Sequence, residues 1–82
     1  DATLKVRDLL MTVYHTQKAL QRSEQHLYKS IKDMGLQEEF ESAFKRHHFQ
    51  MTINNNETWE ATLDGDGVKM KIDHQSRLTP VK

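Results

Sequence analysis

Apolar residues recur with two different periods along this chain, and the change of period separates a helical part from a strand part. Between Leu4 and Met34 there is no proline or glycine, and apolar residues follow the 3.6-residue spacing of one helix face. Five of them are spaced seven apart: Val6, Val13, Leu20, Leu27 and Met34. The pattern predicts a long first helix over residues 1–34, ended by Gly35.

The polar residues in the middle of this helix leave a second interpretation open. The positions between the heptad residues are Thr16 or Gln17 and then Ser23 or Glu24, which are poor members of an apolar stripe. The alternative is a break near residues 22–24, with Ser23 capping another helix, so that the chain folds back within the monomer.

A shorter second helix is expected over residues 36–48. Glutamates near its start and basic residues near its end would both stabilise the helix dipole. Its apolar face would carry Leu36, Phe40, Ala43, Phe44 and His47, its start Glu38, Glu39 and Glu41, and its end Lys45, Arg46 and His48.

From residue 49 onward the period changes to two, which is typical of strands with one buried face. Apolar and polar residues alternate in three runs, at 49–53, 59–63 and 68–72. The three asparagines at 54–56 suit the first connection, because asparagine tolerates the left-handed conformation. The pattern predicts a three-stranded antiparallel meander over residues 49–74. An irregular tail would follow at 75–82, where Pro80 discourages a further strand.

The stretch Asp64-Gly65-Asp66-Gly67 has two interpretations, a calcium loop or a hairpin turn. An EF-hand loop starting at Asp64 would need an oxygen ligand at its fifth position, glycine at its sixth and an acid at its twelfth, but the chain has valine, lysine and glutamine there. A turn at residues 65–66 instead places every apolar pair on one face of the hairpin. The expected pairs are Leu63 with Val68, Ala61 with Met70 and Trp59 with Ile72, and on the other face Glu60 with Lys71 and Thr62 with Lys69.

Together these elements predict a single α+β domain over residues 1–82. The long N-terminal helix and the short second helix would pack on one face of the three-stranded antiparallel β-meander. The predicted core consists of Leu20, Leu27, Ile31, Met34, Leu36, Phe40, Phe44, Phe49, Met51, Ile53, Trp59, Ala61, Leu63, Val68, Met70 and Ile72.

Composition narrows the classes of function. The chain has 12 Lys and Arg residues, 12 Asp and Glu residues and no cysteine. Equal charges give no overall field toward nucleic acid or an anionic membrane, and a chain without cysteine suits a reducing compartment. The longest apolar run, Leu9–Met11, is too short for a membrane span. We therefore expect a soluble cytoplasmic protein.

The sequence carries no pattern that is typical of an enzyme or of a metal site. The five histidines have no cysteine partners, and no two of them stand four apart on a helix with an acid beside them. There is also no glycine-rich phosphate loop and no nucleophile elbow. We expect no catalytic residues, no metal and no cofactor.

A winged-helix DNA-binding regulator is the alternative function. Residues 27–47 resemble a helix-turn-helix motif, with Gly35 at the bend. The helix that would enter the groove begins with glutamates, however, and DNA phosphates would repel them. Glu41 also stands where the motif needs an apolar residue. Nucleic acid is therefore not the expected partner.

The first helix is expected to supply the functional surface. A helix of this length spans about 46 Å, more than the sheet can cover, and its N-terminal half is apolar around much of its circumference. We predict a small non-enzymatic regulatory or inhibitory protein that binds another protein and forms a homodimer through this helix. The predicted interface residues are Leu4, Val6, Leu10, Val13, Tyr14 and Gln17, with the polar Gln17 fixing the register.

Overall fold

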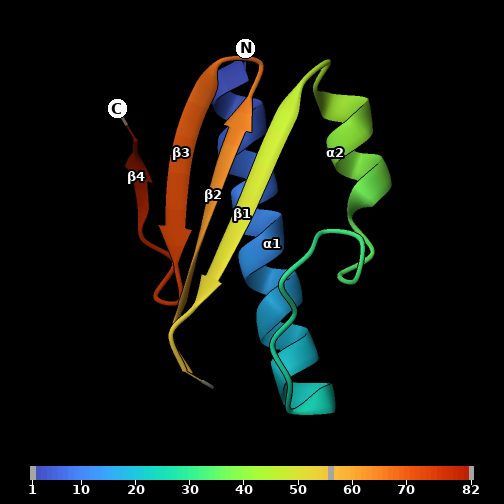
Figure 1. The fold of residues 1–82 in the computed structure, drawn as a ribbon, viewed down its shortest axis with the longest axis vertical. Coiled ribbons are helices and arrows are strands. Elements are labelled where there is room, and N and C mark those ends of the chain that lie inside the picture. The colour runs from blue at the N-terminus through green and yellow to red at the C-terminus, as the bar shows by residue number, and fades with distance from the viewer. Residues whose placement is uncertain (1, 56, 82) are drawn as a thin grey trace.

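A computed structural model describes residues 2–55 and 57–81 of the chain. Its elements in chain order are α1 (Ala2–Glu24), α2 (Gln37–Ala43), β1 (His47–Ile53), β2 (Trp59–Gly65), β3 (Val68–Asp73) and β4 (Leu78–Pro80). The strands form one antiparallel sheet in the order β1-β2-β3-β4. Figure 1 shows α1 crossing behind this sheet and α2 lying beside β1. The predicted α+β fold is confirmed, with four strands in place of three.

The first helix ends at Glu24 and not at residue 34. Gln25 takes a φ of 54°, and the chain then runs back along α1 toward α2 (Figure 1). We call residues 25–36 the return segment. It contains a turn at residues 31–35, and Gly35 ends that turn with a φ of 75°. The interpretation in which the first helix breaks near residues 22–24 is therefore correct, although Ser23 caps no second helix in this segment.

Burial explains why the chain folds back. A continuous helix would carry its C-terminal third beyond the end of the sheet, because seven-residue strands span only about 23 Å. In the return segment the same apolar residues instead reach the core, and the exposed fractions of Leu27, Ile31 and Met34 are 9%, 8% and 6%. The apolar spacing that predicted a helix is thus satisfied by an irregular segment.

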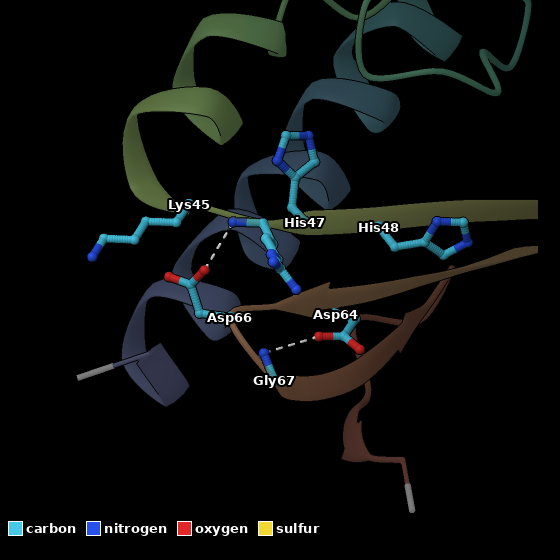
Figure 2. Close-up of a pocket in the computed structure, with 7 residues that line it drawn as sticks. Lys45, His47, His48, Asp64, Asp66 and Gly67 are labelled. Carbon is cyan, nitrogen blue, oxygen red and sulfur yellow. Dashed lines mark hydrogen bonds between the residues drawn. The ribbon is translucent and has the colours of Figure 1, made fainter.

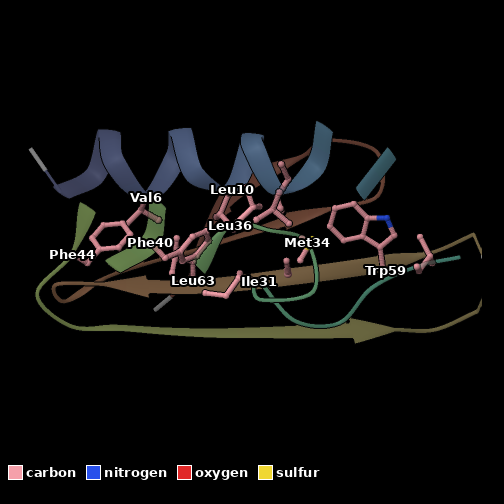
Figure 3. Close-up of a cluster of buried hydrophobic side chains, with 13 residues drawn as sticks. Val6, Leu10, Ile31, Met34, Leu36, Phe40, Phe44, Trp59 and Leu63 are labelled. Carbon is pink, nitrogen blue, oxygen red and sulfur yellow. The ribbon is translucent and has the colours of Figure 1, made fainter. Parts of the chain in front are cut away.

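The core lies between α1 and the face of the sheet that α1 covers (Figure 3). Side chains of α2 and of the return segment complete it. The predicted core did not include the N-terminal half of α1, whose residues Val6, Leu10 and Val13 are fully buried. Most of the predicted core is confirmed, while some of its members are half-buried at the margin: Leu20, Phe49, Met51, Ile53, Val68 and Met70.

The turn between β2 and β3 is made by Asp66 and Gly67, one residue later than predicted. Both residues have positive φ, 50° and 91°, as a type I′ hairpin turn requires. Gly65 is the last residue of β2 and is buried. A Cβ at this position would lie 2.4 Å from Cε1 of Phe44, so the close approach of that ring, and not the backbone conformation, requires glycine here.

The later turn shifts the register of the hairpin by two residues. Leu63 faces Met70 and Ala61 faces Ile72, so the predicted pairs are wrong. A shift of two residues keeps each side chain on its predicted face. For the same reason Lys71 still reaches Glu60, diagonally, with 3.5 Å between Nζ and Oε2.

Two further elements differ from the prediction. The tail is not irregular throughout, because Leu78–Pro80 pairs with β3 as strand β4. Pro80 is compatible with this edge strand because proline has no backbone N–H to donate, and on the solvent side of an edge strand no ladder bond is required. The second helix ends at Ala43, since Phe44 is already extended, with φ −130° and ψ 144°.

The asparagine-rich connection joins β1 to β2 as predicted. The side-chain oxygen of Asn55 accepts hydrogen bonds from the backbone N–H groups of Glu57 (2.8 Å) and Thr58 (3.0 Å). These side-chain bonds add to the backbone bond from Asn54 N to Thr58 O (2.9 Å) that closes the connection. The third asparagine, at residue 56, lies outside the described residues.

Candidate functional site

The six residues predicted to form an interface do not lie together on the surface. Val6, Leu10, Val13 and Gln17 have no exposed area, because their face of α1 packs on the sheet. Tyr14 is half-buried, with its ring centroid 6.3 Å from that of Trp59. Leu4 is 57% exposed. An interface on α1 built from the four buried residues would require the domain to open, so that part of the prediction is wrong for the folded chain.

The buried Gln17 has a structural role. Its side-chain amide hydrogen-bonds both backbone groups of Tyr28 and so fastens the return segment to α1. The Tyr28 hydroxyl donates to Glu24, and this hydrogen bond, with slight burial and nearby acidic charges, raises the pKa of Tyr28. These bonds stabilise the fold and form no reactive group.

A shallow hollow of about 740 Å³ lies where β1 begins and the β2–β3 turn closes (Figure 2). Lys45, Arg46 and His48 line it together with two aspartates. Each aspartate already serves the hairpin: Asp66 Oδ1 accepts from Arg46 N (2.9 Å), and Asp64 Oδ1 accepts from Gly67 N (3.2 Å). The Asp-Gly-Asp-Gly stretch therefore acts as a turn, with its carboxylates bonded to backbone.

Metal and membrane sites have no support in the described part of the chain. Within residues 2–55 and 57–81, no three His, Asp or Glu side chains gather in a way that could hold a metal ion. Nor does any described helix combine the length and the apolar character needed to cross a membrane.

The described part of the chain lacks the first helix that the helix-turn-helix interpretation requires. Residues before Gly35 form a single turn preceded by irregular chain, and not the helix that this motif needs. α2 itself has only seven residues, and its first turn carries Glu38 and Glu39. This segment therefore contains one short helix where the motif needs two.

One edge of the sheet offers unpaired backbone groups. Two bonds set the phase of the β1–β2 ladder: Asn54 N donates to Thr58 O, and Asp66 N donates to Arg46 O, both at 2.9 Å. Because bonded pairs alternate along an antiparallel ladder, residues 48, 50 and 52 bond to β2. The N–H and C=O groups that point away from the sheet belong to His47, Phe49, Met51 and Ile53.

No other part of the described chain covers these groups with hydrogen bonds. Across residues 2–55 and 57–81, no backbone or side-chain hydrogen bond from outside the sheet reaches the backbone of the four residues. We call this row the β1 edge.

The two edges of the sheet differ in how they are protected. Natural sheets protect exposed edges with short strands, prolines and charged residues, especially lysine. β4 is only three residues long and ends in Pro80. β1 is seven residues long, and its sequence HHFQMTI contains no proline, lysine, arginine, aspartate or glutamate. β1 therefore lacks the protecting features of length and sequence, although α2 lies beside this strand (Figure 1).

The surroundings of the β1 edge are asymmetric. On the covered side, the ring of Phe40 from α2 lies 5.6 Å from that of Phe49. Farther along, a hollow of about 230 Å³ opens between Ile53 and Leu27 of the return segment. On the other side of the sheet the strand shows only polar side chains to solvent: His48, Gln50 and Thr52. An added strand would thus meet apolar groups on one side and water on the other.

Comparisons with protein-family models, with curated proteins and with solved structures found no match to this chain.

Sequence reasoning missed the β1 edge although part of the signal was present. The absence of formal charge between residues 47 and 53 can be read from the sequence. That this strand lies at an edge, and which of its residues point outward, depends on strand order and on the phase of the ladder. Neither follows from alternation alone.

Proposed function

We propose that this chain is a small non-enzymatic regulatory or inhibitory protein that binds another protein by accepting an extended segment of it at the β1 edge. The observation that carries this proposal is the row of outward backbone groups on a long, uncharged edge strand. Strand addition uses such groups for affinity and the alternate side chains for specificity. The segment would become a fifth strand of the sheet.

Other features support the proposal in part. The described residues hold no metal-binding cluster, and the aspartates that line the hollow where β1 begins are bonded to backbone N–H groups. The absence of cysteine supports placing the protein in the reducing cytoplasm. A homodimer through α1 is not included, because most of its predicted residues are buried in the core.

A selection from phage-displayed random linear peptides tests the function without a known partner. The protein serves as bait, and bound peptides are then tested against Met51→Pro and Met51→Ala. Proline removes the outward N–H of residue 51, whereas alanine retains it and removes a similar part of the side chain. Peptides that add a strand should bind the alanine variant and fail to bind the proline variant.

Amide hydrogen exchange supplies a readout on the unmodified protein. Binding should slow exchange at Phe49, Met51 and Ile53, whose N–H groups point outward, and should change little at Gln50 and Thr52, whose N–H groups already bond to β2. If no peptide is enriched, or if enriched peptides leave the outward amides unprotected, the proposed function is wrong.

A further inference from the structure

We infer that the added segment runs antiparallel to β1 and carries apolar residues opposite Ile53, Met51 and Phe49 and an acidic residue opposite His48. This inference rests on the proposed strand addition and specifies its partner chemistry. In the partner's own direction the segment reads apolar-x-apolar-x-apolar-acidic. Each of these four partner positions is defined by the residue of β1 that it faces.

The direction follows from the sheet. All three strand pairs present are antiparallel. Antiparallel pairing is slightly more stable per residue than parallel pairing, and sheets of one type are over-represented. In the antiparallel direction the residue opposite Ile53 comes first and the residue opposite His48 comes five positions later.

The apolar positions follow from the covered side of β1. Phe49, Met51 and Ile53 are each half-buried, so each retains apolar surface that a cross-strand neighbour would remove from water. The residue opposite Ile53 also faces the hollow beside Leu27. These positions are two residues apart, which places all three partner side chains on the same face of the added strand.

The acidic position follows from the charges where β1 begins. Lys45 and Arg46 are exposed, and within the described residues neither makes an ion pair. The nearby carboxylates are already engaged, because Asp66 Oδ1 accepts from Arg46 N and Asp64 Oδ1 accepts from Gly67 N. The cationic ends of Lys45 and Arg46 are exposed, so an acid on the added strand can reach them from the open side of β1. The charges there favour an anion.

One strand can carry both the apolar residue opposite Ile53 and the acidic residue opposite His48. Ile53 and His48 are five residues apart, so their side chains point to opposite faces of the sheet. A partner residue opposite Ile53 faces the helices, and the one opposite His48 faces solvent beside Arg46. An apolar residue and an acid five positions apart on an extended segment satisfy both.

A second copy of the chain is a poorer occupant of the edge. α2 lies beside β1 on the side away from β2 (Figure 1), and Phe40 and Phe44 lie between α1 and the sheet (Figure 3). A copy related by a two-fold axis at the edge would bring its own α2 up against α2 of the first copy. A single extended segment brings no helix with it.

Three fluorescein-labelled peptides of equal length test the inference by anisotropy. The first is Val-Thr-Val-Thr-Val-Glu-Thr, the second has the same residues in reverse order, and the third has lysine in place of glutamate. The first should bind most tightly. Exchanging glutamate for lysine should weaken binding about five-fold, as expected for an exposed ion pair replaced by repulsion. With the Arg46→Glu variant, the preference for glutamate over lysine should disappear or reverse.

Each other result identifies a different error. Tighter binding of the reversed peptide would overturn the direction, and equal binding of the lysine peptide would overturn the acidic position. If library peptides protect the outward amides while none of the three designed peptides binds, the partner chemistry is wrong and strand addition stands. A native dimer in light scattering that Met51→Pro converts to a monomer would make the occupant a second copy.

Discussion

Gln17 and Tyr28 are joined by two hydrogen bonds that hold the return segment against α1. Nε2 of Gln17 donates to Tyr28 O at 2.7 Å, and Tyr28 N donates to Oε1 of Gln17 at 3.0 Å. The glutamine side chain is fully buried and thus supplies the donor and the acceptor that a neighbouring strand would otherwise provide. One side chain on the helix therefore satisfies the backbone of a segment without regular structure.

Replacement of Gln17 by methionine should destabilise the protein strongly. Methionine fills a similar volume but leaves both backbone groups of Tyr28 without partners, at a cost of about 2–4 kcal/mol in the free energy of unfolding. Urea denaturation followed by circular dichroism measures this loss.

Gln50→Met is the matched control for that experiment. Gln50 is exposed on the open face of the sheet, so the same chemical change should alter stability by less than about 0.5 kcal/mol. Equal effects at the two positions would show that the bonds to Tyr28 contribute nothing.

Gly65→Ala should cost about 1–3 kcal/mol because the new methyl group would overlap the ring of Phe44. The backbone at this position does not require glycine, so the cost depends on the ring. A double-mutant cycle with Phe44→Leu, measured by chemical denaturation, should therefore show a favourable coupling between the two changes.

Gly67→Ala provides the contrast. No atom lies within 4 Å of a Cβ built there, but the φ of 91° strains any other residue by about 1 kcal/mol. This cost should be unaffected by Phe44→Leu. A similar coupling for both glycines would contradict the packing explanation at Gly65.

The sequence predicted the elements of this fold better than their ends. Period-two alternation located the three long strands because each has one face on the core, and successive hairpins placed them in order. Alternation cannot distinguish registers that differ by two residues, so the turn was assigned one residue early. β4 has only three residues, too few to show a period.

The first helix shows why a helical pattern can mislead. Leu27, Ile31 and Met34 have helical spacing, yet a turn and an irregular segment also bring them to the core. The deciding interaction, between Gln17 and the backbone of Tyr28, joins residues eleven apart and leaves no periodic signal. Four of the six residues predicted to form an interface on α1 are fully buried, so only the part of that prediction built on them is wrong.

Asp73 makes stability depend on pH. Slight burial alone would raise the pKa of this carboxyl, but hydrogen bonds from Arg77 N and Gln75 N and the charges of Arg77 and His74 outweigh it, and the pKa is lowered. A carboxyl with a lowered pKa in the folded state stabilises that state above its unfolded pKa. This contribution is lost as the pH falls through the folded pKa.

Asp73→Asn should therefore be less stable than the native protein at neutral pH, with the difference shrinking below about pH 4. Asparagine retains the oxygen that accepts both bonds and removes only the charge, so the comparison isolates the electrostatic part. Thermal unfolding from pH 7 to pH 3 measures it. A difference that stays constant over this range would exclude the charge as its source.

The double change Leu10→Glu plus Val13→Glu should unfold the protein. Both side chains are fully buried between α1 and the sheet, and two carboxylates placed there would lose their hydration without gaining partners. The cost of several kcal/mol exceeds what a domain of this size can lose. Leu4→Glu, at the exposed end of the same helix, should leave the circular dichroism spectrum and the unfolding midpoint nearly unchanged. A folded double mutant that changes from dimer to monomer in light scattering would instead restore α1 as an interface between copies.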